Sequence, residues 1–180
     1  MPSTHVALLR GINLAGKNKL PMKNLTEMFA DAGCTGVAAY IQSGNVIFTA
    51  VPGLASRIAS LTTAQIKKRF GFEIPVILRT ADELKKVISD NPFLKAGAAD
   101  RELYVMFLAD APDAARVRSL DPDRSLPDTY QVRGREIYLR LPNGMGRSKL
   151  SNQYFDSKLA TVSTARNWRT VTTLLELMKA

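Results

Sequence analysis

The chain has 180 residues, of which 46% are hydrophobic and 23% charged, a composition that excludes a disordered or fibrous protein. A single cysteine, Cys34, and a single histidine, His5, exclude a disulfide framework and a zinc site built on clustered Cys or His side chains. No apolar run approaches the roughly 18 residues that span a bilayer, and no secretory signal opens the chain. We therefore expect a cytoplasmic protein with no membrane partner, metal or cofactor.

The first 80 residues alternate short apolar runs with helical patterns. Strands are expected at 5–12, 37–41, 46–49 and 73–79, and helices from Pro21 to about residue 32 and over 54–70. Ser43-Gly44-Asn45 supplies the turn between the second and third strands. The order β-α-β-β-α-β is typical of a ferredoxin-like unit, a mostly antiparallel sheet with two helices on one face.

The second part of the chain repeats most of this order. Helices are expected at 81–89, 112–120, 150–160 and 165–179, and strands at 102–109, 130–132 and 136–141. A terminal helix stands where the last strand of a second ferredoxin-like unit would lie. The sequence therefore predicts an α+β fold with two ferredoxin-like subdomains, 1–80 and 81–180, the second ending in extra C-terminal helices.

The net charge of +9 is unevenly distributed. Residues 1–80 carry 9 basic and 3 acidic side chains (+6), residues 81–120 carry 6 and 7 (−1), and residues 121–180 carry 10 and 6 (+4). Helix N-termini favour acidic side chains, yet cations lie at three expected helix starts. They are Lys19 and Lys23, Arg147 and Lys149, and Arg166 and Arg169. Either these side chains extend into water, or an anion binds beside them.

Two further motifs are candidates for ligand contact. Gly11 to Asn18 has the spacing G-x-x-x-x-G-K of a phosphate-binding P-loop, but Asn18 replaces the Ser or Thr that ligates magnesium, and Pro21 would lie inside the following helix. We interpret this segment as a strand-to-helix loop. The segment Tyr40 to Asn45 is polar and either only forms a turn or presents donors to a ligand.

Three blocks of this sequence resemble the domain-of-unknown-function 1697 family. They are Leu8 to Asn13 with Gly16-Lys17-Asn18 and Met22, then Tyr40 to Val46, and finally Pro142-Asn143-Gly144, Arg147 to Leu150, Lys158 and Thr164 to Trp168 with Thr170-Val171. Leu14-Ala15 stands where the family often has Val-Gly. The resemblance implies a small bacterial protein with two ferredoxin-like α+β subdomains, and it brings no assigned activity.

The leading hypothesis is a protein that binds an anionic, phosphate-bearing small ligand in a cleft between the subdomains. The predicted ligand-binding residues are Arg10, Asn13, Lys17, Asn18, Lys19, Gln42, Ser43, Asn45, Arg147, Lys149, Arg166 and Asn167. One alternative is an enzyme acting on a phosphorylated or nucleotide substrate, with Ser43 or Ser148 beside a lysine as its candidate nucleophile. Another is a non-catalytic scaffold whose polar blocks lock the subdomains together, or a nucleic-acid-binding protein.

Overall fold

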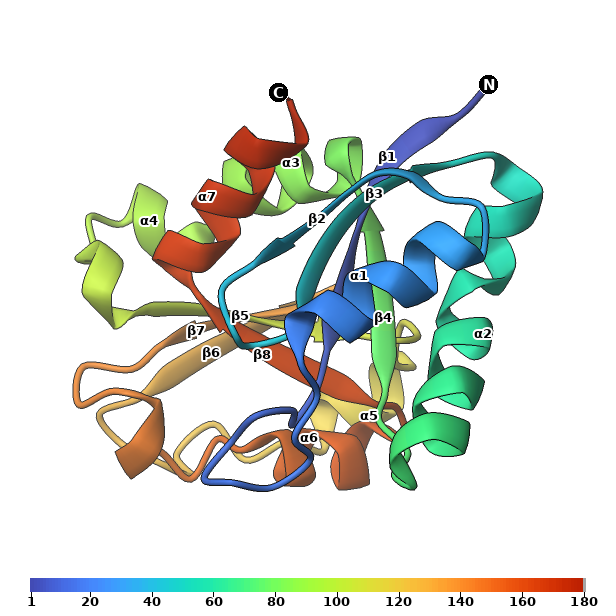
Figure 1. The fold of residues 1–180 in the computed structure, drawn as a ribbon. Coiled ribbons are helices and arrows are strands. Elements are labelled where there is room, and N and C mark those ends of the chain that lie inside the picture. Colours follow the sequence, from blue (N-terminus) through green and yellow to red (C-terminus); the bar gives the residue numbers. More distant parts are fainter. Residues whose placement is uncertain (180) are drawn as a thin grey trace. The chain divides into compact units, whose positions relative to one another are not determined.

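The computed structural model describes residues 1–179 (Figure 1). The elements follow in chain order: β1 (Ser3–Leu9), α1 (Met22–Asp31), β2 (Thr35–Tyr40), β3 (Asn45–Ala50), α2 (Pro52–Phe70), β4 (Val76–Thr80), α3 (Ala81–Ser89), α4 (Pro92–Lys95), η1 (Asp100–Glu102), β5 (Leu103–Leu108), α5 (Ala114–Arg118), β6 (Thr129–Arg133), β7 (Glu136–Arg140), η2 (Met145–Arg147), α6 (Asn152–Leu159), β8 (Ser163–Asn167) and α7 (Trp168–Met178).

These elements form two compact units, each with a four-stranded antiparallel sheet. Met1–Lys85 and the chain from Leu174 onward make the first unit, and Lys86–Thr173 makes the second. The strand order is β2-β3-β1-β4 in one sheet and β6-β7-β5-β8 in the other. Both units have the element order β-α-β-β-α-β, so the predicted α+β class with two ferredoxin-like subdomains is confirmed. The division into subdomains at residues 1–80 and 81–180 stays a prediction.

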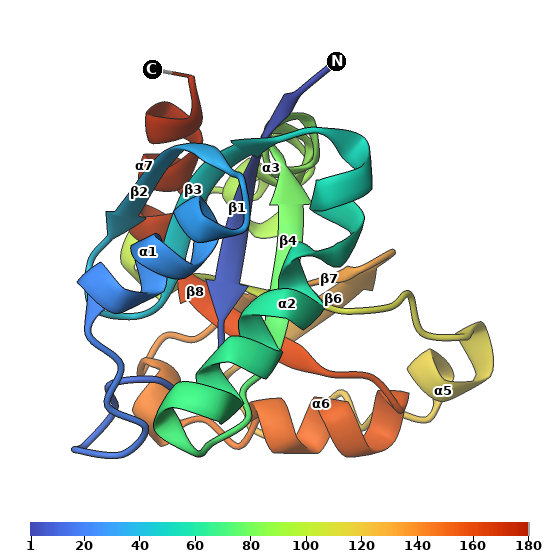
Figure 2. The same cartoon turned by 45° about the vertical axis from the view of Figure 1, so that its right-hand side comes forward.

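In the first unit, strand β1 is central and pairs with β3 on one side and β4 on the other. Alternate side chains of a strand point to opposite faces, so Ala7 and Leu9 share one face. They belong to a core with the buried residues Leu25 and Phe29 of α1 and Ile58 of α2. Figure 2 shows α1 and α2 on the same face of this sheet.

In the second unit, strand β5 takes the central place, between β7 and β8. Met106 and Leu108 of β5 belong to a core with Tyr154, Phe155 and Leu159 of α6. This apolar face of α6 determines which residues of the helix remain at the surface.

The second sheet contains one strand that the sequence analysis missed. Ser163–Asn167 forms β8, so the expectation that Arg166 and Asn167 lie in the first turn of the last helix is wrong. This strand is short, and its residues (Ser, Thr, Ala, Arg and Asn) have no apolar alternation. Pairing with β5 establishes it, with Leu108 opposite Ser163 and Tyr104 opposite Asn167.

The start of helix α7 is capped by Asn167. Asn167 Oδ1 accepts a hydrogen bond from Thr170 N at 2.8 Å. Along the helix, Trp168, Val171 and Leu175 are buried.

Within residues 1–179 no helix is long and apolar enough to cross a membrane. In the same range, no group of three His, Cys, Asp or Glu side chains is placed to hold a metal ion.

The thiol of Cys34 is buried beside the first core, and this burial raises its pKa. Because the thiolate is the reactive form, we expect folded protein to react with a disulfide reagent at about pH 8 far more slowly than unfolded protein. Labelling followed over a urea series should rise together with the loss of secondary structure. Fast labelling of folded protein would contradict the placement of Cys34.

Candidate functional site

Of the predicted ligand-binding residues, eight lie in the first unit and four in the second. In the first unit, the loop between β1 and α1 is tied together by Asn13. Asn13 Oδ1 accepts a hydrogen bond from Leu20 N at 2.9 Å, and Asn13 Nδ2 donates to Leu20 O at 2.9 Å and to Gln42 O at 3.1 Å. The last bond brings the two predicted loop segments of this unit together.

The rest of this loop is held in the same way. Asn18 Nδ2 donates to Gly11 O at 2.9 Å, and Lys17 N donates to Leu14 O at 2.8 Å across the turn. Asn13 and Asn18 have φ angles of 53° and 48°, in the left-handed region that asparagine tolerates better than most residues. The two asparagine amides therefore serve the loop itself, and the Lys17 and Lys19 side chains extend into solvent. Arg10 is half-buried at the start of the loop.

An asparagine side chain also holds the β2–β3 turn together. Asn45 is fully buried, and its Nδ2 donates to Tyr40 O at 3.1 Å and to Ser43 Oγ at 2.9 Å. A Cβ atom on Gly44 would lie 2.8 Å from Leu9 Cβ, so only glycine fits there. Asn45 and Ser43 therefore bond to the turn, while the Gln42 side chain is exposed.

In the second unit, Arg166 and Asn167 also have internal partners. The guanidinium of Arg166 is buried and donates to Thr164 Oγ1 and Ala165 O, both at 2.8 Å. Burial lowers the pKa of Arg166 to about 10, so the side chain stays protonated at neutral pH. Asn167 caps α7, as described above. Arg147 ends η2 and is exposed, as is Lys149.

A cationic pocket lies next to Lys149. It contains Arg124, which is not among the residues predicted from the sequence. The guanidinium of Arg124 stacks on the ring of Tyr154, with Cζ 4.0 Å from the ring centroid. Arg124 Nε donates to Lys149 O at 3.0 Å. The terminal nitrogens of Arg124 make no hydrogen bond or ion pair with a described residue. Arg124 is therefore held in one orientation with its terminal N–H groups available.

The pocket has a volume of about 350 Å³ and runs along the exposed side of α6. Its lining consists of two cations, four neutral residues with polar groups and no carboxylate: Arg124, Ser151, Gln153, Tyr154, Ser157 and Lys158. The ammonium group of Lys158 has no partner among the described residues. The lining therefore combines positive charge with hydrogen-bond donors.

The loop that carries Arg124 is fastened at both sides of that residue. Asp121 N donates to Tyr154 Oη at 3.0 Å. Ser125 Oγ accepts from Lys149 N at 2.9 Å and donates to Asp128 Oδ2 at 2.7 Å. The loop on either side of Arg124 is thus bound to α6 or to the segment before it, through the Asp121 backbone and the Ser125 side chain.

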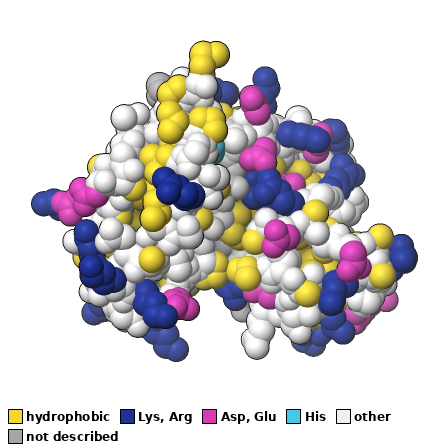
Figure 3. Space-filling model, turned by 90° about the vertical axis from the view of Figure 1, so that its right-hand side faces the viewer, with side chains coloured by type: hydrophobic (Ala, Val, Ile, Leu, Met, Phe, Trp, Pro, Cys, Tyr) yellow, Lys and Arg dark blue, Asp and Glu magenta, His cyan; other side chains and the backbone are white. Residues whose placement is uncertain are grey.

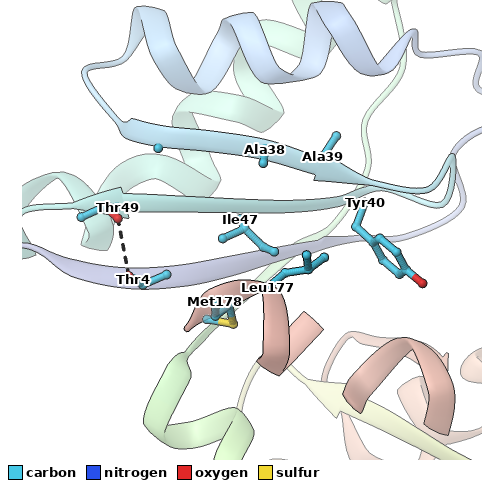
Figure 4. A pocket seen from close by; sticks show the side chains of 9 residues that line it. Thr4, Ala38, Ala39, Tyr40, Ile47, Thr49, Leu177 and Met178 are labelled. Carbon is cyan, nitrogen blue, oxygen red and sulfur yellow. Dashed lines mark hydrogen bonds between the residues drawn. The ribbon is translucent and has the colours of Figure 1, made fainter. Parts of the chain in front are cut away.

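A second pocket, of about 490 Å³, differs in chemistry (Figure 4). It lies in the first unit on strands β1, β2 and β3 and the end of α7, and its lining contains no charged side chain. Figure 4 shows Ile47, Leu177 and Met178 close together on one side of the sheet. This apolar groove offers no counter-charge to an anion.

The surface cations do not form one continuous patch on the face drawn in Figure 3. Lys and Arg side chains are scattered there, with Asp and Glu between several of them. This distribution differs from the basic stripe that proteins use to follow a nucleic-acid backbone.

The two serines considered as nucleophiles both take part in local turns. Ser43 Oγ accepts from Asn45 Nδ2, and Ser148 Oγ accepts from Leu150 N at 3.1 Å. For Ser148, no described Lys, His, Asp or Glu side chain lies within hydrogen-bond reach. A general base beside the hydroxyl, which a serine nucleophile requires, is therefore not observed for Ser148.

Comparisons with known proteins address the fold and the family. The family model described as "Protein of unknown function (DUF1697)" matches residues 2–138. No curated protein matches the sequence. Among solved structures, the conserved bacterial protein SP0830 from Streptococcus pneumoniae is similar at 19% identity and a TM-score of 0.71, with 99% of each chain covered. That likeness is one of fold.

The role of Asn13 can be tested by two substitutions. Asn13→Ala removes three hydrogen bonds and places alanine at a positive φ, so we expect a loss of about 2–4 kcal/mol in the free energy of unfolding. Asn13→Gly removes the same bonds without the steric strain and should lose less. Urea unfolding measures both. Gln42→Ala, which keeps its backbone carbonyl, is the control and should change stability by less than about 0.5 kcal/mol. Wild-type stability of Asn13→Ala would refute this role.

Proposed function

Since the chain belongs to the DUF1697 family, whose function is unknown, we propose from the geometry of its second unit that it binds a small phosphate-bearing anion in the pocket on α6. The proposed site contains none of the predicted residues, although Lys149 supplies the carbonyl that fixes Arg124. It also lies entirely within the second unit, and so differs from the cleft between subdomains that the sequence suggested.

The observation that carries this proposal is the arrangement of Arg124. A guanidinium offers N–H groups in a planar fork that matches two oxygens of a phosphate. A free arginine side chain loses rotamer entropy when it binds, about 1.5–2 kcal/mol for full immobilisation. Arg124 is already oriented by the Tyr154 ring and the Lys149 carbonyl, so the side chain has lost much of its rotamer entropy before a ligand binds.

The charge of the lining supports an anion as the ligand. Arg124 and Lys158 form no ion pair with a residue that the structure describes, and no carboxylate lines the pocket to neutralise them. The hydroxyl group of Ser151 adds a neutral donor at the same surface. A negatively charged ligand with several acceptor oxygens satisfies Arg124 and Ser151 together.

A small anion fits better than a polyanion. Binding to a nucleic-acid backbone needs several phosphate contacts along a track. The pocket holds two cations, fewer than such a track provides. Weak binding of an oligonucleotide with a steep dependence on salt would support the nucleic-acid alternative instead.

The test is phosphate binding by an Arg124 variant. Arg124→Gln removes the charge and the fork from an exposed position, so the fold should be unaffected. A charge-assisted hydrogen bond contributes about 1.5–3 kcal/mol, so we expect inorganic phosphate to bind roughly 10- to 100-fold more weakly. Isothermal titration calorimetry measures the affinity.

Arg101→Gln is the matched control. Arg101 is an exposed arginine of the same unit and does not line the pocket, so the variant carries the same net charge as Arg124→Gln. It should keep the affinity of the wild-type protein for phosphate. Equal weakening in both variants would indicate nonspecific attraction to a basic protein and would contradict the proposed site.

A further inference from the structure

The pocket is larger than a phosphate ion needs. Ser151, the N-cap of α6, and Lys158, in the last turn of that helix, both line the pocket and are seven residues apart. At 1.5 Å per residue this separation is about 10 Å along the helix axis. A bare phosphate ion is shorter than this separation, so it leaves part of the pocket unfilled. The volume of about 350 Å³ falls within the range of small-molecule sites.

Two other side chains that line the pocket, Gln153 and Ser157, are neutral and polar. Gln153 and Ser157 have no hydrogen-bond partner among the described side chains, and both line the pocket. An amide and a hydroxyl each donate and accept hydrogen bonds, so they match hydroxyl groups of a ligand. Lys158 lies in the last turn of α6, where the helix dipole stabilises a cation. It therefore does not require a second anionic group on the ligand.

The pocket offers no free aromatic face for a nucleobase. Tyr154 is the one aromatic side chain among its lining residues, and Arg124 covers its ring. Tyr154 also packs against Phe155, with ring centroids 5.1 Å apart. Proteins that hold bases without sequence preference stack them on exposed aromatic rings.

From these three features, and resting on the proposed function, we infer that the ligand is the phosphomonoester of a polyol, a sugar phosphate rather than a nucleotide or inorganic phosphate. Its phosphate binds Arg124 and the Ser151 hydroxyl. Its hydroxyl groups bind Gln153 and Ser157 further along α6. The outer face of a guanidinium also stacks on bases in some complexes, which makes a nucleotide the rival ligand.

The experiment compares three probes by calorimetry: inorganic phosphate, ribose 5-phosphate and adenosine 5′-monophosphate. We expect ribose 5-phosphate to bind about 10-fold more tightly than phosphate, because one or two additional hydrogen bonds provide a gain of this size. Adenosine 5′-monophosphate, which has the same phosphate and ribose, should bind no more tightly than ribose 5-phosphate.

A double variant, Gln153→Ala with Ser157→Ala, tests the residues assigned to the polyol. Both side chains are exposed, so the fold should be retained, which circular dichroism checks. The variant should bind ribose 5-phosphate about as weakly as phosphate and keep wild-type affinity for phosphate itself. Ser119→Ala, an exposed serine of the same unit outside the pocket, should change neither affinity.

The outcomes separate the two claims. If phosphate binds in an Arg124-dependent way but ribose 5-phosphate shows no gain, or adenosine 5′-monophosphate binds more tightly than ribose 5-phosphate, the polyol inference is overturned and the anion site stands. If none of the probes binds in an Arg124-dependent way, the proposed function fails and the inference fails with it.

Discussion

Tyr154 is the residue on which the second unit's surface chemistry depends. Its ring is buried in the core beside Phe155, and its hydroxyl oxygen accepts the N–H of Asp121. The same ring supports the guanidinium of Arg124. One side chain therefore joins helix α6, the loop before β6 and the cation of the proposed site. Because the ring is part of a packed core, it offers a rigid support that a surface residue would not.

The two units use polar side chains in opposite ways. In the first unit, Asn13, Asn18 and Asn45 direct their amides into the loops that carry them, and Lys17 and Lys19 extend from a hydrogen-bonded loop into solvent. In the second unit, backbone groups and an aromatic ring hold Arg124, and its terminal N–H groups remain available. A polar residue that completes its own loop contributes stability, whereas one held by its neighbours with donors to spare can bind a ligand.

Much of the fold could be predicted from the sequence because apolar periodicity is a local property. Strand β1 and helix α1 follow directly from their patterns. Strand β8 could not be predicted, since Ser163–Asn167 lacks apolar alternation and depends on pairing with β5. The site was harder to predict than the fold because it depends on contacts between residues that are distant in sequence. The Arg124 side chain acquires its role from Tyr154, thirty residues away in sequence, and from Lys149 O, so no local pattern marks it. Cations at helix starts led to Lys149, which lies beside the pocket, and to Arg166, which is buried.

The central claim is that the anion binds on α6 next to Arg124, and backbone and arginine side-chain NMR during a titration with inorganic phosphate tests it most directly. The account predicts that the Nε–H signal of Arg124 and the amide signals of Ser151 to Lys158 shift together and saturate with one affinity. Shifts confined to the loop of Lys17 and Lys19, or spread over lysines and arginines of both units without saturation, would contradict it.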